Sequence, residues 1–335
     1  MRILGIGNLN RMGELFCQIF RDLGYDADYL EWHPKNYRPW EKIEPILVSG
    51  LNKELSLLNF IFKQRKKYDL FVCHYAFQSA MICNLLKLNY VCHARGYDIT
   101  HSPNHWLYGG YLKNSFRNSK AMWCSTPVLL DYAKKYNKKV HFIPNMIRTD
   151  IYKPGEKTKN KNIRIFMPSR HVWRNKGIDK SLEMFKEIQK SCDAEIHFIE
   201  WGEDVERTKK LIERMNLKKV FWHKLILDQY KMAKMYNFAD VVWDSFGFTE
   251  DRLNLIALEA MSCNSLPIIK KLKKNLYPGS PPIVQGIDEK DIIEKTLNFE
   301  RFDSQRKKQR EWIEKYFSYN AVKEKLKKCL EEIKF

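Results

Sequence analysis

The sequence predicts an α/β protein made of two Rossmann-like domains. Its 335 residues are enough for two α/β domains of about 150 residues each. In the first half, short apolar strand patterns alternate with amphipathic helix patterns, as in a doubly wound parallel sheet. A second series begins with the buried strand at residue 163. We therefore expect an N-terminal domain over residues 1–145, a second domain over 146–315 and a terminal helix over 316–335.

The elements of the first domain follow one another at short intervals. Ile3 to Ile6 forms the first strand, and a turn from Asn8 to Gly13 leads into a helix from Leu15 to Leu23 that Gly24 ends. Short apolar runs predict later strands at 27–30, 69–73 and 90–93. The first ten residues read as a strand because their apolar run is too short for a signal peptide. We therefore expect a cytoplasmic protein.

The first strand, loop and helix of the second domain carry positive side chains. An apolar strand that starts at Ile163 runs into Ser169 and Arg170, and a basic loop is closed by Lys176 and Gly177 before the next helix. Ligands of open α/β sheets bind at the carboxyl ends of strands, which is where this loop begins. Taken alone, the spacing of Arg and Lys fits a solvated loop of a basic protein equally well.

A later strand, loop and helix carry acidic groups. Val241 and Val242 form the end of a buried strand, and Asp244 and Ser245 follow where that strand meets solvent. The next segment has apolar residues at helical spacing, which places Glu259 near the buried face of a helix. A carboxylate in that position needs a hydroxyl or cationic partner.

Together, these segments resemble the signature of the retaining nucleotide-sugar glycosyltransferases of family 4, which have the GT-B fold. The family has an acidic residue, seven others and a Glu, and Asp251 and Glu259 match that spacing with Asp in the first place. Asn264 stands where the family usually has Gly, and Phe246-Gly247 precede the first acid instead of following it. The resemblance is closest over Ile143 to Ile269 and looser before. It implies two domains that face a cleft, with the C-terminal helix returning to the first domain.

The resemblance implies how a UDP- or GDP-linked sugar would be bound as the donor. Arg170 and Lys176 would neutralise its diphosphate, Glu259 would hold ribose hydroxyls, and Asp251 or nearby backbone amides would hold the sugar. Fixed cations aimed at the growing charge of the leaving diphosphate lower the barrier and can replace a metal ion. We therefore expect neither a metal nor another cofactor. The other donor-binding residues implied are Ser169, Gly177, Gly202, Glu203, His223, Asn254, Leu255 and Ile256.

The resemblance also implies cleft residues in the first domain, near the acceptor. Asn10, Arg11 and Gly13 occupy the turn that is glycine-rich in the family, although a plain strand-to-helix turn explains them too. The segment HARGYDI resembles a family segment in which His-Gly or Arg-Gly precedes an acidic residue. Arg95 would then hold a phosphate or a sugar hydroxyl. Asp98 fits a cleft residue and a cap of the following turn equally well.

The net charge of +19 exceeds what a diphosphate requires. Basic surfaces attract anionic membranes or nucleic acid. Enzymes of this fold often reach lipid-linked acceptors through a basic, aromatic face of the first domain, which Trp106, Tyr108, Tyr111, Lys113 and Arg117 could form. An anionic membrane surface is therefore a further candidate partner. The alternative is that the charge serves only solubility.

We expect an enzyme that moves a hexose or N-acetylhexosamine, with retention, to a hydroxyl of a glycan or lipid-linked acceptor. It would work in the cytoplasm or at the inner face of the membrane. One alternative is a nucleotide-sugar 2-epimerase of the same fold. Another is a basic nucleic-acid-binding or DNA-glycosylating protein, but no recognition motif supports a nucleic acid partner. The eight cysteines include no Cys-x-x-Cys pair, so the sequence suggests neither a zinc site nor a disulfide framework.

Overall fold

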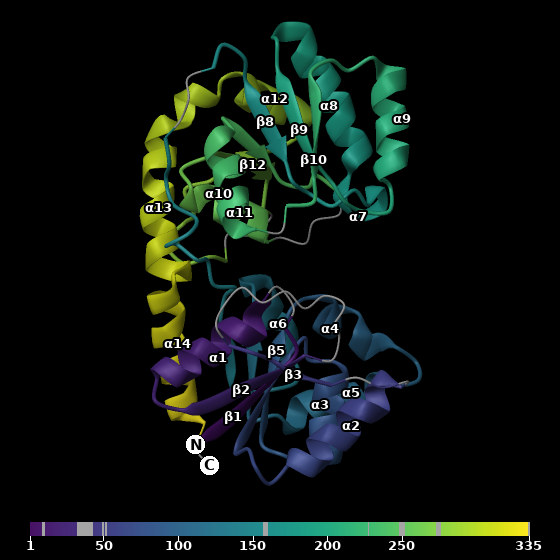
Figure 1. The fold of residues 1–335 in the computed structure, drawn as a ribbon, viewed down its shortest axis with the longest axis vertical. Coiled ribbons are helices and arrows are strands. Elements are labelled where there is room, and N and C mark those ends of the chain that lie inside the picture. The colour runs from purple at the N-terminus through teal and green to yellow at the C-terminus, as the bar shows by residue number, and fades with distance from the viewer. Residues whose placement is uncertain are drawn as a thin grey trace. The chain divides into compact units, whose positions relative to one another are not determined.

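The computed structural model divides the described chain into two compact units. The first comprises Met1–Met146 with Tyr319–Phe335, and the second comprises Ile147–Ser318. Each unit is built around one parallel sheet (Figure 1). Asn10 and Asp251 lie outside the described residues. The structure describes residues 1–8, 11–31, 43–48, 50, 52–156, 160–226, 228–247, 252–272 and 276–333.

The described part of the first unit contains a seven-stranded parallel sheet in the order β3-β2-β1-β4-β5-β6-β7. β1 pairs with β2 on one side and with β4 on the other, so the winding of the chain reverses beside β1. The central strands are buried along nearly their whole length, as a parallel sheet covered on both faces requires. The strands are β1 (Arg2–Ile6), β2 (Asp26–Glu31), β3 (Ile46–Leu47), β4 (Leu70–His74), β5 (Tyr90–Ala94), β6 (Ala121–Cys124) and β7 (Val140–Phe142).

Helices cover both faces of this sheet. α1 and α14 pack on one face, where Phe16 and Leu326 join Trp123 of β6 in one apolar core. α2, α3 and α5 pack on the other face through residues such as Leu57 and Phe116. The terminal helix α14 thus belongs to the first unit. The helices are α1 (Met12–Asp22), α2 (Lys53–Gln64), α3 (Gln78–Leu85), α4 (Tyr97–Thr100), η3 (Ser102–Asn104), α5 (Gly109–Asn118), η4 (Pro127–Leu129), α6 (Leu130–Ala133) and α14 (Tyr319–Glu332).

The described part of the second unit contains a six-stranded parallel sheet in the order β10-β9-β8-β11-β12-β13. β8 lies between β9 and β11, so the winding reverses between β8 and β11. That point is the expected ligand position of an open α/β sheet. The strands are β8 (Arg164–Met167), β9 (Glu195–Glu200), β10 (Val220–Lys224), β11 (Val241–Trp243), β12 (Leu266–Lys270) and β13 (Val284–Gly286).

The helices of the second unit also divide between two faces. α8, α9 and α12 pack on one face, where Phe185 stacks on Trp243 of β11. α10 and α11 pack on the other face, and α13 packs on α11. The helices are α7 (Trp173–Lys176), α8 (Ile178–Ser191), α9 (Val205–Met215), α10 (Gln229–Phe238), α11 (Leu255–Ser262), α12 (Glu289–Leu297), η5 (Phe299–Phe302) and α13 (Asp303–Phe317).

The predicted fold class is confirmed in its two parallel α/β sheets and its returning C-terminal helix. One boundary differs, because α1 begins at Met12 and Gly13 lies within its first turn. A Cβ on Gly13 would lie 2.2 Å from the carbonyl oxygen of Gly7, so glycine lets the helix start close to the end of β1. Among the described residues, no helix combines the length and apolar character needed to cross a membrane.

Candidate functional site

The loops after β8 and β11 leave the second sheet side by side. The two strands pair in parallel, so Ser169 and Arg170 follow one strand while Asp244 and Ser245 follow its neighbour. Arg170 is exposed, and the other three side chains are buried. The Oγ atoms of Ser169 and Ser245 have no hydrogen-bond partner among the described residues. Two buried serine hydroxyls at the switch point therefore keep unused hydrogen-bonding capacity.

The backbone at Lys176 is tied to the loop after β11. The carbonyl oxygen of Lys176 accepts hydrogen bonds from the backbone N–H groups of Phe246 and Gly247, each at 3.2 Å. Gly177 follows with a φ of 61°. A Cβ at this position would lie 2.7 Å from the backbone nitrogen of Gly247. Glycine is therefore required both by the left-handed conformation and by the close approach of the two loops.

Charges at the switch point influence one another's pKa values. Burial lowers the pKa of Lys176; the charge of Asp244 raises it, and those of Arg252 and Arg170 lower it further. Burial likewise raises the pKa of Asp244, against the opposing effects of Lys176 and Arg252. These four described residues combine three cations with one anion. Such a group favours an anionic ligand.

Helix α11 begins beside this group. Its N-cap residue, Asn254, makes no side-chain hydrogen bond to the first turn. The Asn254 amide instead donates to Oδ2 of Asp244 at 2.9 Å. The N–H groups of Leu255 and Ile256 therefore lie in a helix terminus that its N-cap side chain does not cap. The amino end of a helix carries a partial positive charge, which adds to that of the cations.

Glu259 lies in the same helix and has two tyrosine partners. Its Oε2 accepts a hydrogen bond from the Tyr236 hydroxyl at 2.9 Å, and Tyr152 donates a second one. Burial raises the pKa of Glu259 to about 7, although both hydrogen bonds act to lower it. The residue as a whole is half-buried. It can therefore accept further hydrogen bonds from ligand hydroxyl groups.

Gly202 and Glu203 form the turn after β9. Gly202 has a φ of 118°, and a Cβ there would lie 2.5 Å from the carbonyl oxygen of His171. The backbone N–H of His171 donates to the carbonyl oxygen of Trp201 at 2.9 Å. The turn thus packs directly on the residue that follows Arg170. The side chain of Glu203 is exposed.

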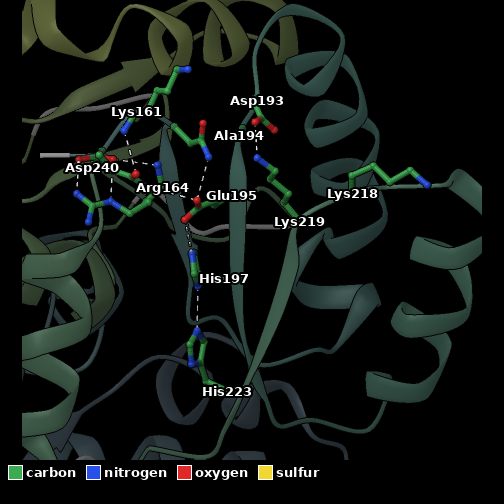
Figure 2. Close-up of polar contacts among 12 residues, drawn as sticks. Lys161, Arg164, Asp193, Ala194, Glu195, His197, Lys218, Lys219, His223 and Asp240 are labelled. Atoms are coloured by element: carbon green, nitrogen blue, oxygen red, sulfur yellow. Dashed lines mark hydrogen bonds and ion pairs between the residues drawn. The ribbon is translucent and has the colours of Figure 1, made fainter. Parts of the chain in front are cut away.

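His223, which the sequence assigned to the donor, has a histidine partner. Its Nε2 lies 3.0 Å from Nδ1 of His197, and Nε2 of His197 lies 3.7 Å from Glu195 (Figure 2). Burial lowers the pKa of both imidazoles, that of His197 to about 4. Arg164 and Asp240 form an ion pair of 3.2 Å nearby. Arg164 and Glu195 are the first residues of β8 and β9. These contacts therefore extend to the amino-terminal ends of the strands, whereas Lys176 follows the carboxyl end of β8.

In the first unit, the turn after β1 is organised by local hydrogen bonds. Asn8 Oδ1 accepts the backbone N–H of Glu14 at 3.1 Å, at the start of α1. Arg11 has a φ of 62°, and its Nη2 lies 3.5 Å from the buried carboxylate of Glu14. Gly13 provides the close approach of α1 to β1 described above. The structure thus brings Arg11 and Gly13 to the carboxyl end of β1.

Asp98 holds two loops of the first unit together. Its fully buried carboxylate accepts three backbone N–H groups, at 3.0, 2.8 and 2.9 Å, from Arg95, Gly96 and Ala76. The first two belong to the loop after β5 and the third to the loop after β4. Burial raises the pKa of Asp98, and these hydrogen bonds oppose the rise. The bonds reach backward along the chain, so they differ from the predicted cap of the following turn.

Arg95 is 8% exposed and lies near two buried histidines. Nδ1 of His74 is 3.1 Å from Nδ1 of His93. Burial lowers the pKa of both imidazoles, that of His74 to about 3, and the charge of Arg95 lowers both further. Both imidazoles are therefore neutral at physiological pH. The Asp98 hydrogen bonds fix the backbone from which Arg95 extends.

Sequence reasoning missed four residues of the second-unit site. The sequence placed Asp244 at the end of a strand but gave it no role in the site. Arg252 was not considered, although its neighbour Asp251 was expected to hold the sugar. Their positions, at a strand end and beside a predicted site residue, could have identified both as candidates. Tyr236 and Tyr152 contact Glu259 from α10 and from the segment after β7. No spacing in the sequence connects either tyrosine to Glu259.

The described residues contain no cluster of acidic, histidine and cysteine side chains of the kind that binds a metal ion. No three of their His, Cys, Asp and Glu side chains gather in a way that could hold a metal ion. The cations, serine hydroxyls and backbone N–H groups described above are chemically suited to an anionic ligand.

Several solved structures are similar to the chain over nearly its whole length. A sucrose-phosphate synthase from Thermosynechococcus elongatus has a TM-score of 0.79 at 14% identity, and 99% of each chain is covered. A glycosyltransferase from Rickettsia africae has a TM-score of 0.74 at 14% identity, with 99% of this chain and 98% of that one covered. HepE from Anabaena, solved with UDP and glucose, has a TM-score of 0.72 at 13% identity, with 99% of each chain covered.

No protein-family model matches the chain, and no curated protein matches it in sequence. Likeness at such low identity shows the fold alone. The fold is the two-unit, parallel-sheet fold called GT-B.

Proposed function

We propose that this protein transfers a hexose or N-acetylhexosamine from a nucleoside diphosphate sugar to a hydroxyl acceptor, with retention at the anomeric carbon and without a metal ion. The observation that carries the proposal is the group formed by Arg170, Lys176, Arg252 and Asp244 at the switch point of the second sheet. Its charges sum to two positive units, which complement the two negative charges of a sugar-linked diphosphate. Solved neighbours that contain UDP and UDP-glucose support the same donor class.

The proposed chemistry uses the leaving group itself. The acceptor oxygen attacks the anomeric carbon from the face that the diphosphate leaves, and the electron pair of the broken bond passes to the leaving phosphate oxygen. That oxygen takes the proton of the acceptor hydroxyl. Negative charge on the diphosphate grows during this step, and fixed cations that stabilise it lower the barrier. Arg170 and Lys176 would serve this purpose without Lewis acid help.

Other residues of the site would bind the ground state of the donor. Ser169 Oγ would donate to a phosphate oxygen, and the N–H groups of Leu255 and Ile256 would approach the sugar or phosphate. Glu259 would accept hydrogen bonds from the ribose hydroxyls. Each hydrogen bond to a charged group contributes roughly 1.5 to 3 kcal/mol, so loss of either cation is expected to lower the rate at least about tenfold.

The test is donor binding and turnover with EDTA present. The protein is incubated with UDP- and GDP-sugars one at a time, and thermal stabilisation and slow donor hydrolysis are recorded. The Arg170→Ala/Lys176→Ala variant should lose both responses. A matched control, Lys186→Ala/Arg214→Ala, removes the same charge from exposed positions on α8 and α9 and should respond like the wild type.

The products separate the remaining alternatives. Release of UDP or GDP with a free sugar of unchanged anomeric configuration supports retaining transfer. Conversion of the donor to an epimeric nucleotide sugar would identify a 2-epimerase instead. If no donor stabilises the protein and DNA binding falls steeply with salt, the basic surface is a nucleic acid site and the proposal fails.

For the acceptor, we infer a glycan or a lipid-linked glycan used at the cytoplasmic face of a membrane. The segment between η3 and α5 exposes Trp106 and Leu107, at 87% and 70%, and Tyr111 of α5 is 39% exposed. Tyr108 is instead half-buried, stacked on His105 with ring centroids 3.9 Å apart. The following helix carries Lys113 and Arg117, and exposed Trp and Leu close to basic residues in the chain are typical of interfacial contact with anionic lipid.

Vesicle sedimentation tests this membrane contact. Binding to vesicles with 30% phosphatidylglycerol should exceed binding to neutral vesicles, and Trp106→Ala/Leu107→Ala should remove most of the difference. Leu55→Ala, which removes a side chain exposed to 62% on α2, is the control. Equal binding to both vesicle types would contradict the membrane contact and would indicate that the net positive charge serves solubility.

A further inference from the structure

Asp244 is a buried acid to which the proposed reaction assigns a charge but no contact with the donor. It follows β11 at the switch point, and it is 2% exposed. Its Oδ1 accepts the backbone N–H of Ser245 at 2.7 Å. Its Oδ2 accepts the side-chain amide of Asn254 at 2.9 Å. A carboxylate so deeply buried cannot attack a substrate, yet burial of its charge is costly unless charged or hydrogen-bonded partners compensate.

The hydrogen bonds of Asp244 connect three parts of the site. Two and three residues after it, Phe246 and Gly247 donate to the carbonyl oxygen of Lys176, so the loop that Asp244 begins also holds the backbone of the lysine. Through Asn254, Asp244 reaches the first turn of α11. Asn is among the most favourable N-cap residues. The side chain of Asn254 nevertheless makes no capping hydrogen bond and donates to Asp244 instead.

Charged groups surround the acid and Lys176. Lys176 ends α7, Arg252 precedes α11 and Arg170 follows β8. The charges of Lys176 and Arg252 lower the pKa of Asp244. The pKa of Lys176 is raised by Asp244 and lowered by Arg252 and Arg170. Of these four described residues, Asp244 is the acidic one and the other three are basic. Without it, Lys176 would share a largely desolvated region with two permanent cations, which disfavours its protonated form.

We propose that Asp244 is a positioning residue that keeps Lys176 protonated and in place beside the amino end of α11, ready for the diphosphate of the donor. This inference rests on the proposed function, because it assigns a role within the same site. The carboxylate supplies the counter-charge before the donor arrives, and the diphosphate supplies it afterwards. The hydrogen bonds to Ser245 and Asn254 keep the carboxylate aligned in both states.

The decisive substitution removes the charge and keeps the shape. Asp244→Asn can still accept hydrogen bonds through its carbonyl oxygen, but it no longer stabilises an ammonium group. The matched control is Asp240→Asn in the same unit. Asp240 forms an ion pair with Arg164 at 3.2 Å and accepts its backbone N–H at 2.9 Å. It therefore contributes to structure without acting on Lys176.

The first measurement is the pKa of Lys176 itself. Competitive labelling of the amines with acetic anhydride over a pH series, followed by peptide mass spectrometry, gives this value and needs no substrate. We expect a pKa lowered by about one unit in Asp244→Asn and unchanged in Asp240→Asn. A purely structural role would lower the stability of both variants and leave the pKa of Lys176 unchanged, which would overturn the proposal.

The second measurement is the pH profile of kcat/KM with the donor that the wild type uses. The alkaline limb should move to lower pH by the same amount in Asp244→Asn, because Lys176 loses its proton earlier. In a Lys176→Arg background this shift should vanish, since arginine keeps its charge. A uniform loss of activity at every pH would contradict the proposal.

An exchange variant covers the case in which Asp244→Asn does not fold. Asp244→Asn/Asn254→Asp preserves both the hydrogen bond and the charge of the pair, and it should keep the Lys176 pKa close to that of the wild type. A value lowered by one unit or more would overturn the proposal. If no donor reacts with the wild type, the proposed function fails, whereas the labelling result still decides the role of Asp244.

Discussion

Replacing Glu259 with Gln should stabilise the protein at alkaline pH while it impairs donor binding. Burial raises the pKa of Glu259 from 4.5 to about 7. At about 1.4 kcal/mol for each pH unit, ionisation of this carboxyl group costs the folded state about 3 kcal/mol. Because the folded pKa is the higher one, the stabilising contribution is complete below pH 4.5 and is lost as the pH rises through 7. Gln never ionises, so the variant avoids this loss and still offers an oxygen to Tyr236.

The assay is urea unfolding of the wild type and Glu259→Gln at pH 5 and pH 8.5. The two units can unfold separately, so the transition of the second unit is the one to compare. We expect the free energy of unfolding of the variant to exceed that of the wild type by less than about 1 kcal/mol at pH 5 and by about 3 kcal/mol at pH 8.5. Glu213→Gln, at an exposed position of α9, is the control for surface charge. A variant that is less stable than the wild type at pH 8.5, or a difference independent of pH, would refute the reasoning.

Three further predictions concern the second unit. Gly177→Ala should lower the free energy of unfolding by more than about 2 kcal/mol and reduce donor binding, because a Cβ there meets the Gly247 backbone. Gly24→Ala is the control, because a Cβ at Gly24 meets nothing within 4 Å. It should cost only the strain of the left-handed conformation, about 1 kcal/mol. Arg310→Met should cost about 3 kcal/mol in urea unfolding, because Arg310 donates to several backbone carbonyl oxygens around α11. UDP binding at pH 7 should release up to about half a proton, measured by calorimetry in buffers of different ionisation enthalpy, because ribose hydroxyls favour the ionised form of Glu259; buffer-independent heats would contradict this.

The fold could be predicted from the sequence because its signals are local. Buried runs such as Leu70–His74 are apolar along their whole length, and the apolar runs alternate with helix patterns. Gly177 was chosen with Lys176 from a short pattern, and the structure supplies a physical reason for it in the contact with Gly247. The start of α1 was placed too late, because the contact of Gly13 with Gly7 joins a helix to a strand end, and a linear pattern does not report such contacts.

The partners of the site residues could not be predicted, because they come from segments that meet only in the folded chain. Glu259 was known to need a hydroxyl or cationic partner, but nothing in the sequence pointed to Tyr236 of α10 or to Tyr152. For Asp98, both interpretations of the sequence considered its own loop, whereas the structure joins it to Ala76 of another loop. Position at a strand end identified Asp244 but not the cations around it.

Asp244 and Glu259 both lower the stability of the folded state in a way that a bound donor can offset. Burial raises the pKa of Asp244 and of Glu259, so each carboxylate makes the folded state less stable when it ionises. Natural proteins tolerate such a cost where a site must be ready for a ligand, and removing it commonly gains stability at the expense of function. If a donor supplies hydroxyl groups to Glu259 and a diphosphate to Lys176, it offsets part of this cost on binding. The stabilisation of the protein by UDP should therefore grow with pH between 5 and 8, and it should grow less in Glu259→Gln.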